Sequence, residues 1–168
     1  MDAGREGGAS RTSVERVSDR EVVVTRTFDG PARIVFQAWA RPELFMRWWV
    51  PKSTGMTLLS CEMDVRTGGS YRLEFGHPAF EQPVAFFGRY VDVVPNARLV
   101  WTNEESDEGS VNTVTFVEQG GQTVVTVHEL YPTKAALDEA MASGSTGGYG
   151  EQFAQLDELL PTLGASAA

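Results

Sequence analysis

The sequence predicts an α+β fold in which a curved antiparallel sheet of about seven strands surrounds a long C-terminal helix. Residues 57–130 alternate apolar and polar side chains and are divided by short turns, which is typical of antiparallel strands because parallel pairing needs long crossovers. Residues 31–49 contain two short helical patterns ahead of these strands, and residues 149–163 carry a single apolar helical stripe after them. Strands followed by a helix indicate that the helix covers one face of the sheet.

The expected elements follow in chain order. A strand over residues 20–28, rich in β-branched side chains, precedes short helices over 31–40 and 42–49. The remaining strands are predicted over residues 56–65, 69–75, 82–94, 99–105, 111–119 and 122–130. Gly68-Gly69 and Gly120-Gly121 supply the positive φ that tight hairpin turns need, and Gly88 inside a strand predicts a bulge or bend that curves the sheet.

A short helix over residues 133–144 and a long one up to about residue 164 end the chain. The long helix has an apolar stripe made of Tyr149, Phe153, Leu156, Leu160 and Leu163. Its opposite, polar side is made of Glu151, Gln152, Gln155, Asp157 and Glu158. Pro161 lies near its end, so we expect the last residues to bend or fray.

The size and charge of the chain limit the kinds of protein it can be. Its 168 residues suit one domain, expected over residues 19–164, with a flexible tail over 1–18 and a short tail over 165–168. The formal net charge of −9 opposes binding to nucleic acid, whose phosphates need a basic surface. No apolar run is long enough to span a membrane, and the N-terminus lacks the apolar region of a secretory signal, so we expect a cytoplasmic protein.

Few residues in the sequence offer chemistry. The one cysteine, Cys61, lies in a strand pattern and is expected to be a buried, unreactive thiol. His77 lies in a loop, whereas His128 lies near a strand end and could act as an acid or base if it faces inward. The spacing of these residues fits no metal site, and no motif predicts a cofactor.

Four segments, "TRTFDGPARIVFQAWARPELFMRWWVP", "MDVRTGGSYRLEF", "GRYVDVVPNARLVWT" and "GGYGEQFAQLDELL", carry a family resemblance in their order and spacing. Together they resemble the activator-of-heat-shock-protein-90-ATPase homologue family, within the START/SRPBCC superfamily that includes birch-pollen-allergen-like proteins. Val50 stands where the family commonly has glycine, and Tyr149 where it commonly has tryptophan. The resemblance implies the helix-grip fold, with a hydrophobic cavity between the sheet and the C-terminal helix.

The adjacent Trp48 and Trp49 raise the question of what such a cavity would contain. Neighbouring side chains diverge on a helix, so we expect one ring to pack the helix corner and the other to face the cavity, with the assignment open. The predicted cavity residues are Trp48, Trp49, Phe75, Phe86, Tyr90, Trp101, Phe116, His128, Tyr149 and Phe153.

Three functions are compatible with these features, because relatives in the superfamily carry lipids, bind plant hormones, cyclise polyketides or act as co-chaperones. The first is binding of a small apolar or amphipathic molecule without catalysis. The second is a co-chaperone-like regulator of a chaperone ATPase. The third is a cyclase or hydratase with His128 or Tyr149 as acid or base. The protein partner expected is a chaperone or a second copy of the same chain.

Overall fold

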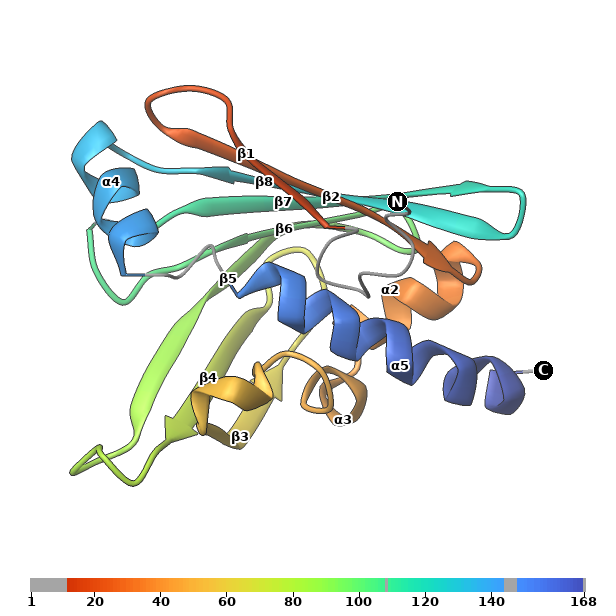
Figure 1. Ribbon diagram of the computed structural model, residues 1–168, viewed down its shortest axis with the longest axis horizontal. Helices are drawn as coiled ribbons and strands as arrows, with labels where there is room; N and C mark the ends of the chain where they lie inside the picture. The colour runs from red at the N-terminus through yellow and green to blue at the C-terminus, as the bar shows by residue number, and fades with distance from the viewer. Residues whose placement is uncertain (1–11, 108, 144–147, 168) are drawn as a thin grey trace, which may run out of the picture.

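The computed structural model describes residues 12–107, 109–143 and 148–167, with side chains as far as residue 163. Eight strands in these ranges form one antiparallel sheet in the order β1-β2-β8-β7-β6-β5-β4-β3 (Figure 1). Their bounds are β1 Ser13–Arg16, β2 Glu21–Asp29, β3 Thr57–Met63, β4 Ser70–Gly76, β5 Val84–Val94, β6 Arg98–Thr102, β7 Val111–Gln119 and β8 Gln122–Leu130. The predicted fold class, a curved antiparallel sheet with a long C-terminal helix, is confirmed.

The additional strand lies in the segment that we expected to be a flexible tail. β1 pairs with β2, with Ser13 opposite Thr25 and Arg16 opposite Val22. All four residues of β1 are exposed, so no apolar alternation announces the strand in the sequence. Arg16 also lies 2.8 Å from Asp138, which ties β1 to the segment after β8. Of the predicted tail, residues 1–11 lie outside the described ranges.

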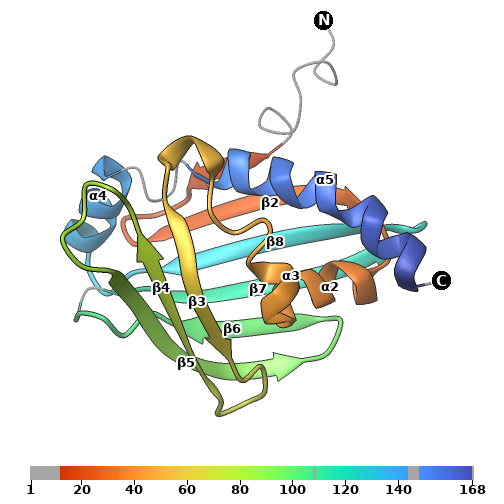
Figure 2. The same cartoon turned by 90° about the horizontal axis from the view of Figure 1, so that it is seen from below.

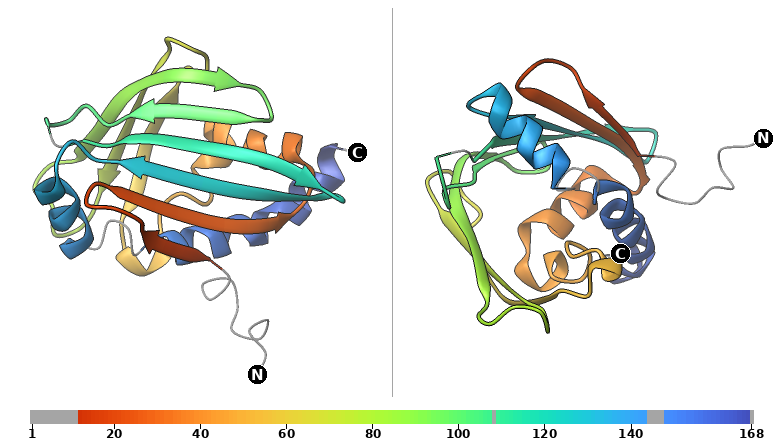
Figure 3. Two further views of the ribbon diagram at one scale, coloured as in Figure 1. Left: turned by 90° about the horizontal axis from the view of Figure 1, so that it is seen from above. Right: turned by 60° about the vertical axis from the view of Figure 1, so that its left-hand side comes forward.

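Three helices lie on the concave side of the sheet: α2 (Ala32–Ala40), α3 (Pro42–Phe45) and α5 (Tyr149–Ala167) (Figures 2 and 3). The apolar stripe of α5 faces β2, where Phe28 and Phe153 meet edge to face at 5.3 Å between ring centroids. The helical backbone continues through Pro161 to Ala167, so residues 165–167 belong to the helix and not to a tail. These contacts form the core between the sheet and the helices.

Two smaller elements complete the walls around this core. α4 (Lys134–Ala142) follows β8, and its first turn is capped by the Thr133 hydroxyl, which accepts from the Ala136 N–H. A short 3-10 helix, η2 (Lys52–Thr54), leads from α3 into β3. None of the helices in the described ranges combines the length and apolarity needed to cross a bilayer.

The sheet bends at Gly88, as the glycine inside a strand pattern predicted. Residues 84–89 of β5 pair with β4, while residues 90–94 pair with β6. A Cβ atom on Gly88 would lie 1.9 Å from the carbonyl oxygen of Thr102, so glycine is needed for the close approach of the two backbones. The β3–β4–β5 arm therefore turns away from the rest of the sheet and faces the helices (Figure 3, right).

Candidate functional site

Trp48 and Trp49 occupy two different environments. Trp48 is fully buried, and its indole Nε1 donates a 2.9 Å hydrogen bond to the carbonyl of Ala38. Trp49 stacks on Phe45, with ring centroids 4.7 Å apart, and lines a cavity. Trp48 thus closes the corner between α2 and α3, whereas Trp49 faces a cavity.

The polar side of α5 holds the segment that follows these tryptophans. Gln155 Nε2 donates to the carbonyls of Trp48 and Val50, each at 2.9 Å, and Gln152 Nε2 donates to the carbonyl of Trp49 at 2.5 Å. Glu151 accepts from the N–H of Ser53 at 2.9 Å. Side chains of α5 therefore fix the short segment between α3 and β3 through hydrogen bonds to its backbone.

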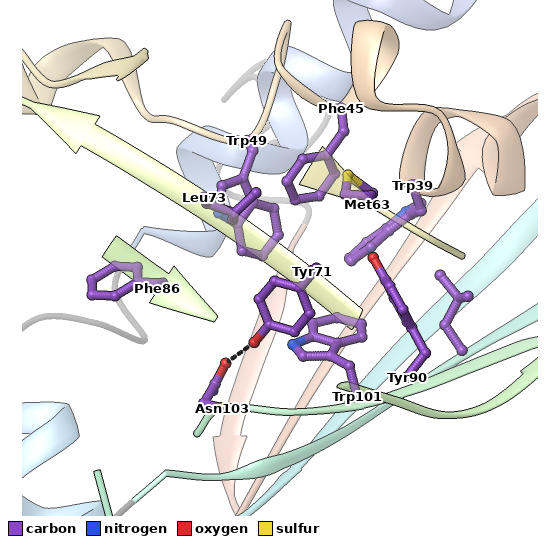
Figure 4. Close-up of a pocket in the computed structure, with 11 residues that line it drawn as sticks. Trp39, Phe45, Trp49, Met63, Tyr71, Leu73, Phe86, Tyr90, Trp101 and Asn103 are labelled. Atoms are coloured by element: carbon purple, nitrogen blue, oxygen red, sulfur yellow. Dashed lines mark hydrogen bonds between the residues drawn. The ribbon is translucent and has the colours of Figure 1, made fainter. Parts of the chain in front are cut away.

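The cavity has a volume of about 590 Å³, within the range of about 300–1,000 Å³ common for small-molecule sites. Its walls come from η2 and the segment before it, α4, the start of α5, the β6–β7 loop and the inner face of the sheet. A smaller cavity of about 70 Å³ adjoins it, and both are lined by Trp49, Phe86, Trp101 and Asn103. Figure 4 shows how the aromatic side chains around the smaller cavity converge from α2, α3 and β4–β6.

Of the ten residues predicted to line a cavity, all but His128 fall into three groups. The large cavity is lined by Trp49, Phe75, Phe86, Trp101 and Tyr149. Tyr90 lines the smaller one. The linings of both cavities leave out Trp48, Phe116 and Phe153, which are buried in the core instead.

His128 lies on the opposite face of the sheet from the cavity. Its Nε2 is 2.8 Å from the carboxylate of Glu21, and the side chain is about one-third exposed. The inner face of β8 is formed by Val125, Val127 and Glu129, and His128 lies between the last two on the other face. The sequence alone left this phase open, because apolar residues fall on both faces of the strand: Val124 and Leu130 share the face of His128, and Val125 and Val127 that of Glu129.

Glu129 is the ionisable group that the sequence reading missed. Only 7% of it is exposed, although it lines the large cavity. One carboxyl oxygen accepts a 2.9 Å hydrogen bond from the Tyr131 hydroxyl, and the other accepts from the Tyr149 hydroxyl. Burial raises the pKa of Glu129, even though the two tyrosine hydroxyls favour its charged form. Burial and the neighbouring Glu129 raise the pKa of Tyr149 well above its ordinary value, so this phenol remains a hydrogen-bond donor.

A chain of polar side chains connects the two cavities. The Tyr71 hydroxyl lies 2.6 Å from the carbonyl oxygen of Thr102 and 2.7 Å from Asn103 Oδ1, the contact drawn in Figure 4. Asn103 Nδ2 donates to Ser110 Oγ at 3.0 Å, and Ser110 donates to Asn112 Oδ1 at 2.9 Å. Asn112 is the strand neighbour of Glu129, so the chain ends beside the buried carboxyl. These groups place hydrogen-bonded polar atoms at one end of a cavity that also has aromatic walls.

The remaining reactive side chains lie apart from this end of the cavity. Burial raises the pKa of Cys61 to about 11, which keeps the thiol protonated and agrees with an unreactive cysteine. His77 accepts a hydrogen bond from the Ala79 N–H through Nδ1, within its loop. The described residues contain no group of three histidine, cysteine or acidic side chains able to hold a metal ion.

Comparison with known families identifies the kind of chain that carries this cavity. Residues 29–161 match the family described as "Activator of Hsp90 ATPase homolog 1-like protein". The chain belongs to this family. The match begins at the end of β2 and reaches into α5, so it covers all elements that line the cavity. The resemblance to the family and the helix-grip fold are thereby confirmed.

Solved structures share this fold at low sequence identity. A Rhodobacter sphaeroides protein superposes with a TM-score of 0.81 at 21% identity, covering 90% of this chain and 99% of its own. A Nitrosomonas europaea protein superposes with a TM-score of 0.80 at 22% identity, and the match covers 89% of this chain and 99% of that protein. An AHSA1-like protein from Aeromonas hydrophila superposes with a TM-score of 0.65 at 18% identity, and the match covers 84% of this chain and 94% of that protein. At such identities the likeness concerns the fold. A search of curated proteins gave no match.

Proposed function

We propose that this protein binds a small amphipathic molecule in the large cavity. The observation that carries the proposal is a cavity of about 590 Å³ that combines aromatic walls with polar groups, among them the hydrogen-bonded set around Glu129. Trp49, Phe75 and Trp101 provide apolar contact area, while Tyr149, Glu129 and Asn112 provide directed hydrogen bonds. This combination is typical of ligand sites, in which apolar area supplies affinity and a few polar groups fix orientation.

The same geometry argues against His128 or Tyr149 as a catalytic acid or base. His128 points away from the cavity, so one of the two candidate catalytic residues does not reach a ligand there. Tyr149 lines the cavity, but its raised pKa makes the phenol a poor base near neutral pH. Its hydroxyl is engaged with Glu129, an arrangement that suits positioning of a polar group.

Native mass spectrometry of the protein purified without denaturants tests this proposal, followed by organic extraction to identify what is bound. We expect a bound small molecule, or uptake of an added apolar dye. Ala140 on α4 lines the cavity, so Ala140→Phe should fill part of it and weaken uptake. Ala142→Phe on the same helix adds the same side chain at an exposed position outside the lining and should leave uptake unchanged. Equal uptake by both variants would count against the cavity as the site.

A second candidate function is regulation of a chaperone ATPase, which the family description suggests. The β3–β4–β5 arm carries exposed apolar side chains suited to protein contact, among them Leu59, Val84 and Phe87. Stimulation of a chaperone ATPase by the purified protein, lost in a Leu59→Ser/Phe87→Ser variant that still takes up the dye, would support this function. Absence of both chaperone binding and stimulation would remove it.

A further inference from the structure

We propose that the large cavity selects a ligand with a positively charged amine, which the carboxyl of Glu129 receives. This inference rests on the proposed ligand binding and adds the chemical class of the ligand. Three acidic residues, Glu105, Glu129 and Glu139, line the cavity. Among the described residues of its lining there is no lysine, arginine or histidine. A cavity with this charge bias attracts cations and repels the carboxylate or phosphate of an anionic lipid.

Glu129 is placed to bind the charged group directly. A carboxylate offers about four lone-pair positions, and the hydroxyls of Tyr131 and Tyr149 occupy one on each oxygen. The remaining positions suit the N–H donors of an alkylammonium group. On the inner face, the strand neighbours of Glu129 are Val22 and Asn112, which are both uncharged. No charged neighbour on these strands therefore competes for the carboxyl.

The aromatic walls support the same choice. Trp49, Trp101 and Tyr131 line the cavity together with Glu129. The faces of aromatic rings attract cations, most strongly where water is excluded. An anionic head group would instead place two negative charges together where neither is well hydrated, which is costly without a cationic partner. Aromatic and acidic linings thus both favour an ammonium over a carboxylate.

Binding of an amine should depend on pH because Glu129 must be charged to receive it. Burial raises the pKa of Glu129, and a bound cation would lower it again. Affinity should therefore rise with pH as Glu129 loses its proton, and fall when the amine itself is neutralised. The other titratable groups around it are Glu105, Glu139, Tyr131 and Tyr149 on the cavity side and His128 on the far face of β8.

Three probes with the same tail test this inference by isothermal titration calorimetry: decylamine, decanol and decanoate. We expect decylamine to bind tightest and decanoate weakest. Glu129→Gln should weaken decylamine by roughly 10- to 100-fold, the usual worth of a hydrogen bond to a charged group, and leave decanol within a few-fold. Glu62→Gln removes an exposed carboxyl that lies outside the cavity lining, so it should leave the affinities of all three probes unchanged.

The outcomes separate this inference from the function on which it rests. Decanol or decanoate binding as tightly as decylamine would overturn the amine preference and leave ligand binding intact. Binding of none of the probes counts against ligand binding itself. The wild-type ranking decides the question even if Glu129→Gln does not fold. An unchanged decylamine affinity in a folded Glu129→Gln variant would show that Glu129 does not bind the ammonium group.

Discussion

The two adjacent tryptophans should have different roles, with Trp48 important for stability and Trp49 for the proposed ligand binding. Trp48 is fully buried and hydrogen-bonded, so Trp48→Ala should cost about 3–5 kcal/mol of unfolding free energy. Trp49 is only partly buried and lines both cavities, so Trp49→Ala should cost clearly less but weaken ligand uptake. Urea unfolding and dye uptake measure the two effects. A larger loss of stability in Trp49→Ala would reverse the assignment.

Glu129 makes stability depend on pH in a particular direction. Burial holds its pKa in the folded state above the ordinary value of 4.5, so the folded protein holds the proton more tightly than the unfolded chain. Its contribution to stability is then favourable below pH 4.5 and is lost as the pH rises through the folded-state pKa. Glu129→Gln removes this dependence.

The difference in unfolding free energy between the variant and the wild type should therefore shift in favour of Glu129→Gln as the pH rises from about 4 to 8. Denaturant unfolding at several pH values measures it. A difference that shifts toward the wild type instead would mean that the tyrosine hydroxyls outweigh burial and lower the pKa.

The position of a single side chain could be predicted only where the spacing of its neighbours in the sequence determines it. The divergence of Trp48 and Trp49 followed from adjacency, but their assignment depends on Ala38 and on the side chains of α5. Both faces of β8 carry apolar residues, so its alternation did not single out Glu129. Of the two tyrosines that bind Glu129, Tyr131 is two residues away in the sequence, whereas Tyr149 comes from the start of α5. Gln152 and Gln155 occupy a polar helix side, and only the tertiary structure shows that they bind backbone carbonyls.

At the scale of elements, Gly88 allows β5 to leave β4 and join β6. Gly88→Ala would place a methyl group against the Thr102 carbonyl, a backbone atom that cannot rotate away. We expect a loss of at least about 1–3 kcal/mol, as for overpacked sites. Gly30→Ala is the matched control, because its Cβ would lie 4.0 Å from Val35 in ordinary contact. Thermal unfolding compares them, and equal midpoints would show that the sheet bends without needing glycine there.

The contact between β2 and α5 includes a buried ion pair. Arg26 has a side chain with no exposed surface, lies 2.9 Å from the carboxylate of Asp157 and stands over the Phe28 ring. Asp157→Ala would leave a buried guanidinium without this carboxylate, at a cost toward the lower end of about 3–5 kcal/mol because Asp157 is 29% exposed. Asp92→Ala breaks the exposed pair with Arg98 and should cost under about 1 kcal/mol. Similar unfolding midpoints in urea for both variants would contradict this ranking.

At the scale of the whole molecule, the sequence predicted the order of β2 to α5 well because most of these elements have a local signal of their own. Alternation marks β4, β7 and β8, paired glycines mark the β3–β4 and β7–β8 turns, and one apolar stripe marks α5. β1 was missed because its residues are all exposed and it forms only by pairing with β2. The cavity could be expected only from the family resemblance, since its walls join segments far apart in the sequence.

Those distant walls would make the proposed ligand binding depend on the whole fold. A ligand in the cavity would contact segments around Pro51, Ala140 and Tyr149, which come together only in the folded state. At about 100 times its Kd, such a ligand should add about 2.7 kcal/mol to the unfolding free energy and raise Tm by about 5–11 °C. Ala140→Phe should reduce this shift, and Ala142→Phe should keep it. Differential scanning calorimetry measures both, and a full shift in Ala140→Phe would place the ligand elsewhere on the protein.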